Sequence, residues 1–413
     1  MKKPFSFKVL TKSGGLARTG VIHTPHGDIE TPTFVVVGTH AEVKCLTSDD
    51  LRDIGVQAML SNGYHLLRRA VMIDAAGGLA KFNGWHGPTM TDSGGFQVMS
   101  LGSGLGKIVS MDQKDIAIAE REARKSERLA LVDDDGVEFR NPWNGRIVKF
   151  TPEMSVRTQH QIGADMMMAF DELTNISDSY EYNVEALERT RKWAERSLAE
   201  HVKQTNLRVE RPYQALFGVL QGAHYQDLRE KAARDLANMR INGAEFDGFG
   251  LGGAFEKERL GEIIAYMTRI LPENKPRHLL GLSKPDDIFV GVENGCDTFD
   301  CVAPTREARH GRVYTLDGDI NLRRAEFESD EKTLDPECDC PVCTAGYTRA
   351  KLRSLLKSSE PEEKARALTM LSGHNVRFII RLTEQIRAAI SSEDFDELKK
   401  YWLKRYYHGT IKT

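Results

Sequence analysis

The sequence lacks any apolar run long enough to cross a membrane, since a spanning helix needs about 20 consecutive apolar residues. Residues 1–5 are not followed by the apolar stretch of a secretory signal peptide. Cysteine is scarce, with six in the chain, and three of them lie within six residues of one another at Cys338, Cys340 and Cys343. These absences exclude a helical membrane span and a disulfide-rich secreted scaffold, and we expect a cytoplasmic protein.

Excess charge of either sign is also missing. The chain of 413 residues carries 57 Lys and Arg against 60 Asp and Glu, for a formal net charge of −3. A positive field over the whole molecule is therefore excluded, and any nucleic-acid contact must come from a local basic patch. With 40% hydrophobic and 28% charged residues, the composition is that of a globular protein.

Short apolar runs alternate with helical patterns over most of the chain. Amphipathic stretches at 183–204, 224–240 and 256–270 separate several of the runs. This alternation predicts an α/β fold, an irregular (β/α)8 TIM-type barrel, with a doubly wound open sheet as the alternative. The eight runs are Phe34–Val37, Ala58–Ser61, Pro88–Thr91, Ala164–Phe170, Ala215–Leu220, Phe246–Leu251, His278–Leu282 and Thr298–Val302.

Three further segments flank or interrupt this pattern. Turn residues within 6–32 separate short alternating runs and predict an N-terminal β-hairpin cap. The charged segment at about 106–135 predicts a solvated helix and hairpin inserted after the third strand, without a chemical role. We expect a catalytic barrel over 1–335 and a zinc-binding helical subdomain over 336–413, packed on the barrel.

Polar residues follow the predicted strands, where the reactive groups of such barrels gather. Two carboxylates, Asp92 and Asp171, suit the N1–H and amino donors of a guanine edge, and Gln221 or a glycine N–H suits its O6. Phe96 could stack on the base. A single strand-end Asp can instead simply cap the next helix. The whole set is Asp92, Asp171, Glu172, Gln221, Gly222, Gly252, Gly253 and Asp300.

Asp300 differs from the other acids because Phe299, Cys301 and Val302 surround it in the sequence. A carboxylate in apolar surroundings is costly unless it has a task. A carboxylate can attack the anomeric carbon of a sugar and form a covalent glycosyl intermediate. A second acid must then manage the proton of the leaving base, and Asp92 is our candidate.

Basic residues gather directly after the last predicted strand. Residues 304–312 contain three arginines and a histidine. Arginine suits phosphate and base-edge contacts, so this segment is a candidate RNA contact, with a solvated loop as the alternative.

The cysteine cluster has the spacing of a metal site. Cys338, Cys340 and Cys343, with His374 as the fourth ligand, would make a closed tetrahedral zinc site with no open position for a substrate. Such a site is structural, although the spacing alone does not select His374. Free thiols are the alternative.

Together these motifs resemble the tRNA-guanine transglycosylases, and the resemblance runs along nearly the whole chain. The residues that show the resemblance are 91–97, 299–306, the Cys-x-Cys-x-x-Cys motif and the His374 that follows it in the sequence. The resemblance implies an enzyme that replaces guanine at the tRNA wobble position by a 7-deazaguanine, for queuosine modification. It also implies a covalent ribosyl-aspartate intermediate, one structural Zn²⁺ and a homodimer.

The resemblance also implies roles for single residues. Asp300 would be the nucleophile and Asp92 the general acid/base. The base pocket would comprise Asp92, Ser93, Gly94, Gly95, Phe96, Asp171, Gln221, Gly253 and Leu280. The tRNA-contacting segments would be Gly281, Leu282, Ser283, Lys284, Pro285, Asp286 and Asp287, then Thr305, Arg306, Glu307, Ala308 and Arg309.

Two other functions fit parts of this pattern. One is a noncatalytic tRNA-binding partner subunit of the same fold, which would not need both Asp92 and Asp300. The other is a retaining glycosidase using the same two acids, which would need neither the arginine-rich segment nor the zinc cluster. The sequence leaves open whether the incoming base is the aminomethyl precursor or queuine.

Overall fold

Eight parallel strands form a closed barrel in the computed structural model, which describes residues 5–97, 99, 130–140, 145–253 and 256–408. The eight predicted runs each overlap one of these strands, so the barrel is confirmed and the open sheet is wrong. In spatial order the strands are β10 (Met166–Met168), β11 (Ala215–Leu220), β12 (Gly248–Leu251), β13 (Arg277–Leu279), β14 (Thr298–Cys301), β4 (Thr33–Val37), β5 (Met59–Ser61) and β6 (Thr89–Thr91).

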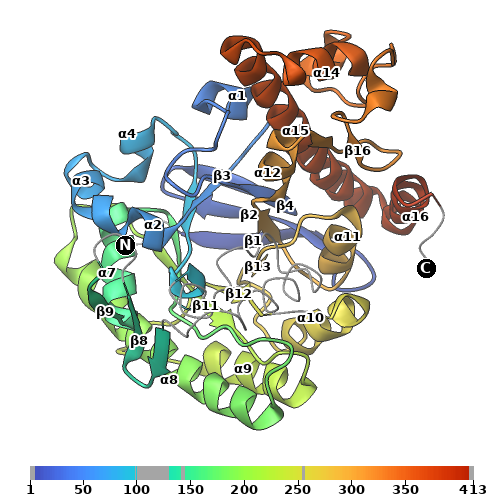
Figure 1. The fold of residues 1–413 in the computed structure, drawn as a ribbon. Coiled ribbons are helices and arrows are strands. Elements are labelled where there is room, and N and C mark those ends of the chain that lie inside the picture. The colour runs from blue at the N-terminus through green and yellow to red at the C-terminus, as the bar shows by residue number, and fades with distance from the viewer. Residues whose placement is uncertain (1–4, 98, 100–129, 141–144, 254–255, 409–413) are drawn as a thin grey trace.

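Helices surround the barrel, as Figure 1 shows. The three amphipathic stretches correspond to α8 (Tyr180–Leu207), α9 (Gln226–Asn238) and α10 (Leu260–Thr268), the last preceded by a 3-10 turn. None of the described helices is both long and apolar enough to cross a membrane. The remaining barrel helices are α1 (Ser48–Asp53), α2 (Gly63–Leu66), α3 (Ala70–Ala75), α4 (Leu79–Asn83), α7 (Pro152–Ile162), α11 (Pro285–Glu293) and α12 (Ala303–Arg309).

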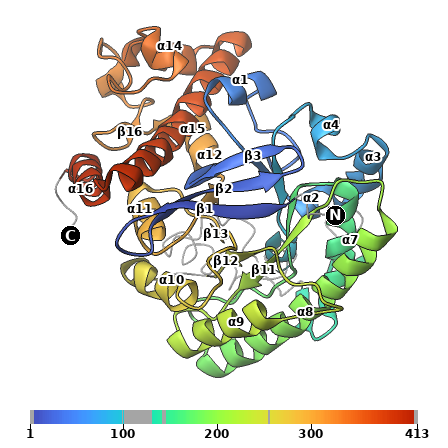
Figure 2. The same ribbon diagram turned by 180° about the vertical axis from the view of Figure 1, so that it is seen from behind.

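An antiparallel sheet closes the N-terminal end of the barrel, and Figure 2 shows it lying across that end. It consists of β1 (Ser6–Lys12), β2 (Arg18–Thr24) and β3 (Gly27–Thr31), so the predicted hairpin is confirmed and has a third strand. Phe5 and Ile22 belong to the same apolar cluster as the barrel residue Phe217, whose ring centroid is 6.0 Å from that of Phe5. A ligand must therefore enter from the opposite end.

Residues 130–140 and 145–150 contain a second small antiparallel sheet that begins at the end of the predicted insertion. Its strands are β7 (Ala130–Asp133), β8 (Gly136–Arg140) and β9 (Ile147–Phe150). The sheet docks on α8, where the Trp193 indole donates a 2.9 Å hydrogen bond to the Asp134 carbonyl. A hairpin of β7 and β8 lies at the end of the predicted insertion but extends past residue 135 to Arg140, whereas the predicted helix falls in residues outside the described ones.

The C-terminal segment packs along one side of the barrel (Figure 1). The 32-residue helix α15 (Pro361–Ser392) contacts α12 and β4, and its Val376 and Phe378 share the main apolar core with Phe34. The predicted boundary at residue 335 stays a prediction. The other elements here are β15 (Arg312–Val313), β16 (Ile320–Asn321), α13 (Pro341–Thr344), α14 (Arg349–Lys357) and α16 (Phe395–Tyr406).

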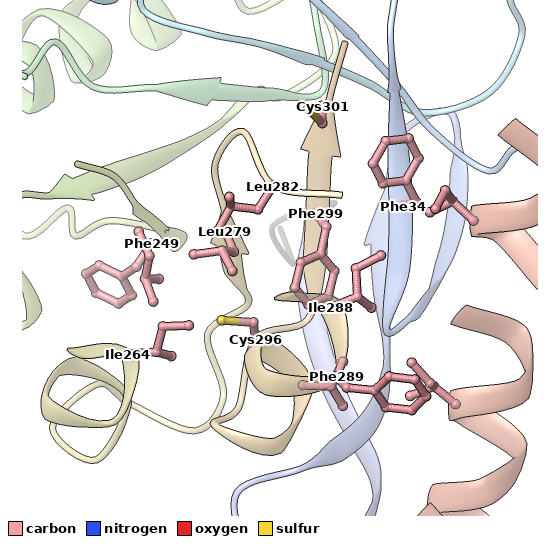
Figure 3. Packing of buried hydrophobic residues seen from close by; sticks show 14 of the residues in the cluster. Phe34, Phe249, Ile264, Leu279, Leu282, Ile288, Phe289, Cys296, Phe299 and Cys301 are labelled. Atoms are coloured by element: carbon pink, nitrogen blue, oxygen red, sulfur yellow. The ribbon is translucent and has the colours of Figure 1, made fainter. Parts of the chain in front are cut away.

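The packing around β14 decides which of its side chains face the cavity. Phe299 lies among apolar side chains of β13 and α11, beside Ile288, in the layer between barrel and helices (Figure 3). Successive side chains of a strand point to opposite faces. Thr298 and Asp300 therefore point into the barrel, while Phe299 anchors the strand from outside.

Candidate active site and metal centre

A cavity of about 450 Å³ opens at the carboxyl ends of the barrel strands. All but one of the predicted base-pocket residues line it, the exception being Gly95. The lining also includes Asp300 and two residues of the predicted tRNA segments. The residues used below are Asn62, Asp92, Ser93, Gly94, Phe96, Asp171, Gln221, Gly252, Gly253, Leu280, Gly281, Asp300 and Arg306.

The Asp92 carboxylate is held by three donors. Asn62 Nδ2 donates to Oδ2 at 2.6 Å, and the backbone N–H groups of Gly63 and Gly94 donate to Oδ1 at 2.9 and 3.1 Å. Burial raises the pKa of Asp92 from 3.8 to about 7, with a further upward contribution from the charge of Asp300. The three hydrogen bonds act in the opposite direction. At neutral pH this group can therefore both give and take a proton.

Asp171 lies against Gln221 and Ser93. Its Oδ2 accepts from Gln221 Nε2 at 2.7 Å and its Oδ1 from Ser93 Oγ at 3.4 Å. Burial raises the pKa of Asp171 from 3.8 to about 6. The carboxylate and the amide therefore form one fixed polar surface that offers acceptors to a ligand.

Asp300 is bound through one of its two oxygens. Its Oδ1 accepts from His278 Nε2 at 3.0 Å and from the backbone N–H of Gly281 at 3.1 Å. The Asp300 side chain is 13% exposed, so it is buried but reaches the cavity.

A buried arginine holds the loops behind the base pocket. Arg229 of α9 donates to the carbonyls of Ala223 at 2.7 Å, Leu220 at 3.2 Å and Gly252 at 2.6 Å. Gly253 has φ +111°, and a Cβ there would lie 2.6 Å from the Arg229 guanidinium. Only glycine suits this position, where a side chain would meet the Arg229 guanidinium.

One predicted strand-end acid has a different task. The Glu172 side chain accepts a 2.7 Å hydrogen bond from Tyr182 and forms an ion pair with Arg189, both in α8. Its backbone N–H donates to Thr190 Oγ1 at 3.0 Å. Glu172 therefore fastens α8 to the barrel rather than contributing to the cavity.

The predicted tRNA segments lie beside the cavity mouth. Gly281 and Arg306 line the cavity, and Lys284, Asp286, Glu307 and Arg309 are partly exposed. Lys284 Nζ is 2.9 Å from an Asp319 oxygen. The side chains of Leu282, Ser283, Pro285, Asp287, Thr305 and Ala308 are buried. A role of these segments in tRNA binding stays a prediction.

Sequence reasoning missed Asn62, His278 and Arg229. Asn62 follows β5 directly, so the strand-end rule that selected Asp92 applied to it as well. His278 interrupts an apolar strand in the way Asp300 does. Arg229 carries no signal in the sequence, because it lies on an ordinary amphipathic helix.

The four predicted metal ligands come together. One ligand atom from each of Cys338, Cys340, Cys343 and His374 lies within 4.8 Å of all the others. Tetrahedral zinc–sulfur bonds of ~2.3 Å require sulfurs about 3.8 Å apart, which fits this spacing. His374 Nε2 is 2.7 Å from the Tyr314 carbonyl oxygen, which leaves Nδ1 facing Cys340 and Cys343 at 3.3 and 3.5 Å. The four residues could hold a metal ion, and the carbonyl orients the imidazole for it.

Comparison with known proteins identifies the family. A family model described as queuine tRNA-ribosyltransferase matches residues 13–408. A queuine tRNA-ribosyltransferase of Halothermothrix orenii is 40% identical over 392 residues, covering 94% of this chain and 94% of its own. One from Streptococcus pneumoniae strain P1031 is 39% identical over 407 residues, covering 98% and 97%.

The chain belongs to the queuine tRNA-ribosyltransferase family. The resemblance inferred from the motifs is thereby confirmed, and the protein is a transferase of this family. Residues 91–97 and 299–306, which carried the resemblance, supply Asp92 and Asp300 to the cavity.

Proposed function

We propose that this ribosyltransferase exchanges guanine at the wobble position of tRNA for a 7-deazaguanine, either the aminomethyl precursor or queuine. The observation that carries the proposal is that two carboxylates, Asp92 and Asp300, line one cavity together with the hydrogen-bonded Asp171 and Gln221. Family membership supports the same activity, because the relatives are named for it.

The exchange runs through a covalent intermediate. An oxygen of Asp300 attacks C1′ of the ribose, and the C1′–N9 bond breaks with its electron pair going to the base. Asp92 donates a proton to the departing guanine. The incoming base then returns a proton to Asp92 as its N9 attacks C1′ and releases the Asp300 carboxylate. Protons, charge and bonds are balanced over the two halves, so no cofactor is consumed.

The cavity offers a partner for each polar group on the guanine edge. Asp171 accepts from N1–H and the amino group, while the Gln221 amide or the Gly253 N–H donates to O6. Phe96 and Leu280 stack on the base faces, which is worth about 1–3 kcal/mol per base. Ser93, Gly94 and Gly95 form the adjoining wall.

The tRNA lies over the cavity mouth in this proposal. Arg306 lines the cavity and is followed by Arg309, so the basic segment begins where the ribose and its phosphates must pass. We further propose that Cys338, Cys340, Cys343 and His374 bind one structural Zn²⁺, that the enzyme acts as a homodimer, and that it works in the cytoplasm.

The test is exchange of labelled guanine into unmodified tRNA by the wild type, Asp300→Asn and, as a matched control, the exposed Asp28→Asn. Asp300→Asn is expected to abolish exchange and adduct trapping while tRNA affinity stays unchanged, and Asp28→Asn is expected to behave as the wild type. Exchange by Asp300→Asn at the wild-type rate would contradict the mechanism. A wild type that binds tRNA without exchanging bases would be a noncatalytic partner subunit instead.

A further inference from the structure

His278 lies inside the barrel, on the strand next to the one that carries Asp300. It belongs to β13 and pairs in register with Thr298 of β14. The side chain is completely buried, and both ring nitrogens have partners. Nε2 lies 3.0 Å from Asp300 Oδ1, and Nδ1 lies 2.8 Å from Thr298 Oγ1. The imidazole thus bridges the two inward-facing residues of β14.

The chemistry of these partners fixes the hydrogen positions. An ionised carboxylate can only accept, so His278 Nε2 must carry a hydrogen and donate it to Asp300. In the neutral imidazole, Nδ1 is then an acceptor, and the hydroxyl of Thr298 donates to it. The Asp300 carboxylate thus sets the tautomer of His278, and Thr298 completes the arrangement by donating to Nδ1 and holding the ring in this orientation.

The consequence for Asp300 is an asymmetry between its two oxygens. Oδ1 receives both His278 Nε2–H and the Gly281 N–H, at 3.0 and 3.1 Å. Within the part of the chain that the structure describes, no donor contacts Oδ2. An oxygen that accepts two hydrogen bonds has its lone pairs engaged, whereas the other oxygen keeps them available for attack.

We infer that His278 is a positioning residue that fixes the Asp300 carboxylate with Oδ2 as the attacking oxygen, and that Thr298 sets the imidazole for this task. The inference rests on the proposed function, because it assigns a role within that reaction. Oδ2 forms the bond to C1′ while Oδ1 stays bound to His278 and Gly281. The carboxylate is thereby oriented before the substrate arrives, and less ordering remains for the reaction step.

Loss of the His278 contact leaves the Gly281 N–H as the remaining donor to Oδ1, so the carboxylate is held less firmly and can turn about its side chain. A misplacement of about 1 Å at a reacting group can cost roughly 100-fold in rate. The effect belongs to the chemical step, because His278 is buried behind Asp300 and does not reach the tRNA surface. A role in filling the core alone would instead lower stability without a selective loss of rate.

Two substitutions at His278 distinguish the contact made by Nε2 from the contact made by Nδ1. The amide nitrogen of Gln reaches the place of Nε2, so His278→Gln keeps a donor for Asp300. The amide of Asn reaches only the place of Nδ1, so His278→Asn keeps the Thr298 contact and loses the Asp300 contact. Thr298→Val removes the hydroxyl while keeping the shape of the side chain, and Thr298→Ser keeps the hydroxyl.

The experiment measures single-turnover formation of the trapped protein–RNA adduct with unmodified tRNA, together with tRNA affinity and the thermal midpoint. We expect His278→Asn to slow adduct formation about 100-fold with unchanged tRNA affinity, His278→Gln to recover most of that rate, and Thr298→Val, but not Thr298→Ser, to slow it. Equal rates for His278→Asn and the wild type would overturn the inference.

Equal impairment of the Asn and Gln variants would also overturn it, as would slow rates that track the loss of folded protein. Failure of the proposed function is a separate result. In that case the wild type itself forms no adduct, whatever the substitution at His278.

Discussion

Removal of the Asn62 side chain tests whether Asp92 acts as the proton donor in one half of the exchange and as the proton acceptor in the other. Asn62 Nδ2 donates to Asp92 Oδ2 at 2.6 Å, and this bond lowers the pKa of Asp92 against the upward effect of burial. In Asn62→Ala the charged carboxylate loses that donor. The pKa of Asp92 is therefore expected to rise above its value of about 7.

The size of the shift follows from the strength of the lost bond. A hydrogen bond to a charged group is worth about 1.5–3 kcal/mol, which corresponds to roughly 1–2 pKa units. For a rise of about 1.5 units, the ionised fraction at pH 7.5 falls roughly eightfold while the protonated fraction rises about fourfold. The two half-reactions need opposite forms, so the variant should affect them in opposite directions.

The assay measures the two half-reactions separately, namely release of guanine and capture of the incoming base. Release of labelled guanine needs the protonated acid and should be preserved or faster at pH 7.5, whereas capture of the incoming base by preformed adduct should slow roughly eightfold. Asn62 also caps α2 by accepting from the His65 N–H at 2.9 Å, so its loss costs about 1 kcal/mol of stability.

The control is Thr47→Ala, which removes the exposed cap of α1 and leaves Asp92 untouched. It should lose similar stability with unchanged kinetics. Equal slowing of both halves in Asn62→Ala, or a pH midpoint that stays in place or falls, would refute the reasoning.

Three other outcomes are expected. Asp171→Asn should stabilise the protein by about 3 kcal/mol above pH 6, because folding raises the pKa of this carboxyl from 3.8 to about 6. Denaturant unfolding should show that this gain in stability vanishes below pH 4. The same variant should lose affinity for the base. The wild type should contain the proposed zinc by elemental analysis; Cys343→Ser should lose it and lower the free energy of unfolding by on the order of 4 kcal/mol. Arg306→Ala should weaken tRNA binding and reduce its salt dependence, with free-base affinity unchanged; an effect confined to the free base would contradict its assignment.

The barrel could be predicted from sequence because each buried parallel strand is a short apolar run. All eight runs overlap a strand, although β4 and β13 begin one residue earlier than predicted and other strands cover only part of their run, such as Met166–Met168 within Ala164–Phe170. The helix expected within 106–135 could not be tested, since residues 100–129 lie outside the described ones. Hydrophobic pattern therefore gives the order of elements well and their ends poorly.

The sequence could predict those residues of the candidate site that directly follow a barrel strand. Asp92, Asp171 and Gln221 follow their strands and do line the cavity. The same rule also selected Glu172, whose side chain instead binds Tyr182 and Arg189 of α8; Glu172 lies in the loop after β10, where strand position does not fix the direction of a side chain. The contact of His278 with Asp300 depends on the register between β13 and β14, which no local pattern specifies.

The position of Cys338, Cys340, Cys343 and His374 indicates what a metal bound there would hold in place. His374 and Asn375 are neighbours on α15, but His374 faces the cysteines whereas Asn375 contacts the arginine-rich segment. Asn375 Nδ2 donates to the carbonyls of Pro304 at 3.0 Å and Arg312 at 3.1 Å, so α15 holds both ends of the arginine-rich segment. Asp300, by contrast, lies on a strand that β4 and β13 hold on either side.

A metal bound at His374 would thus fix the segment that we propose contacts tRNA, rather than the nucleophile. Arg377, one turn further along α15, donates to Asp339 between two of the cysteines at 2.6 and 2.8 Å, which ties the cysteine loop to the same helix. Loss of the metal should consequently weaken tRNA binding before it disturbs the strand that carries Asp300. In this proposal the barrel carries the reacting groups, and the C-terminal segment stabilises the surface beside them.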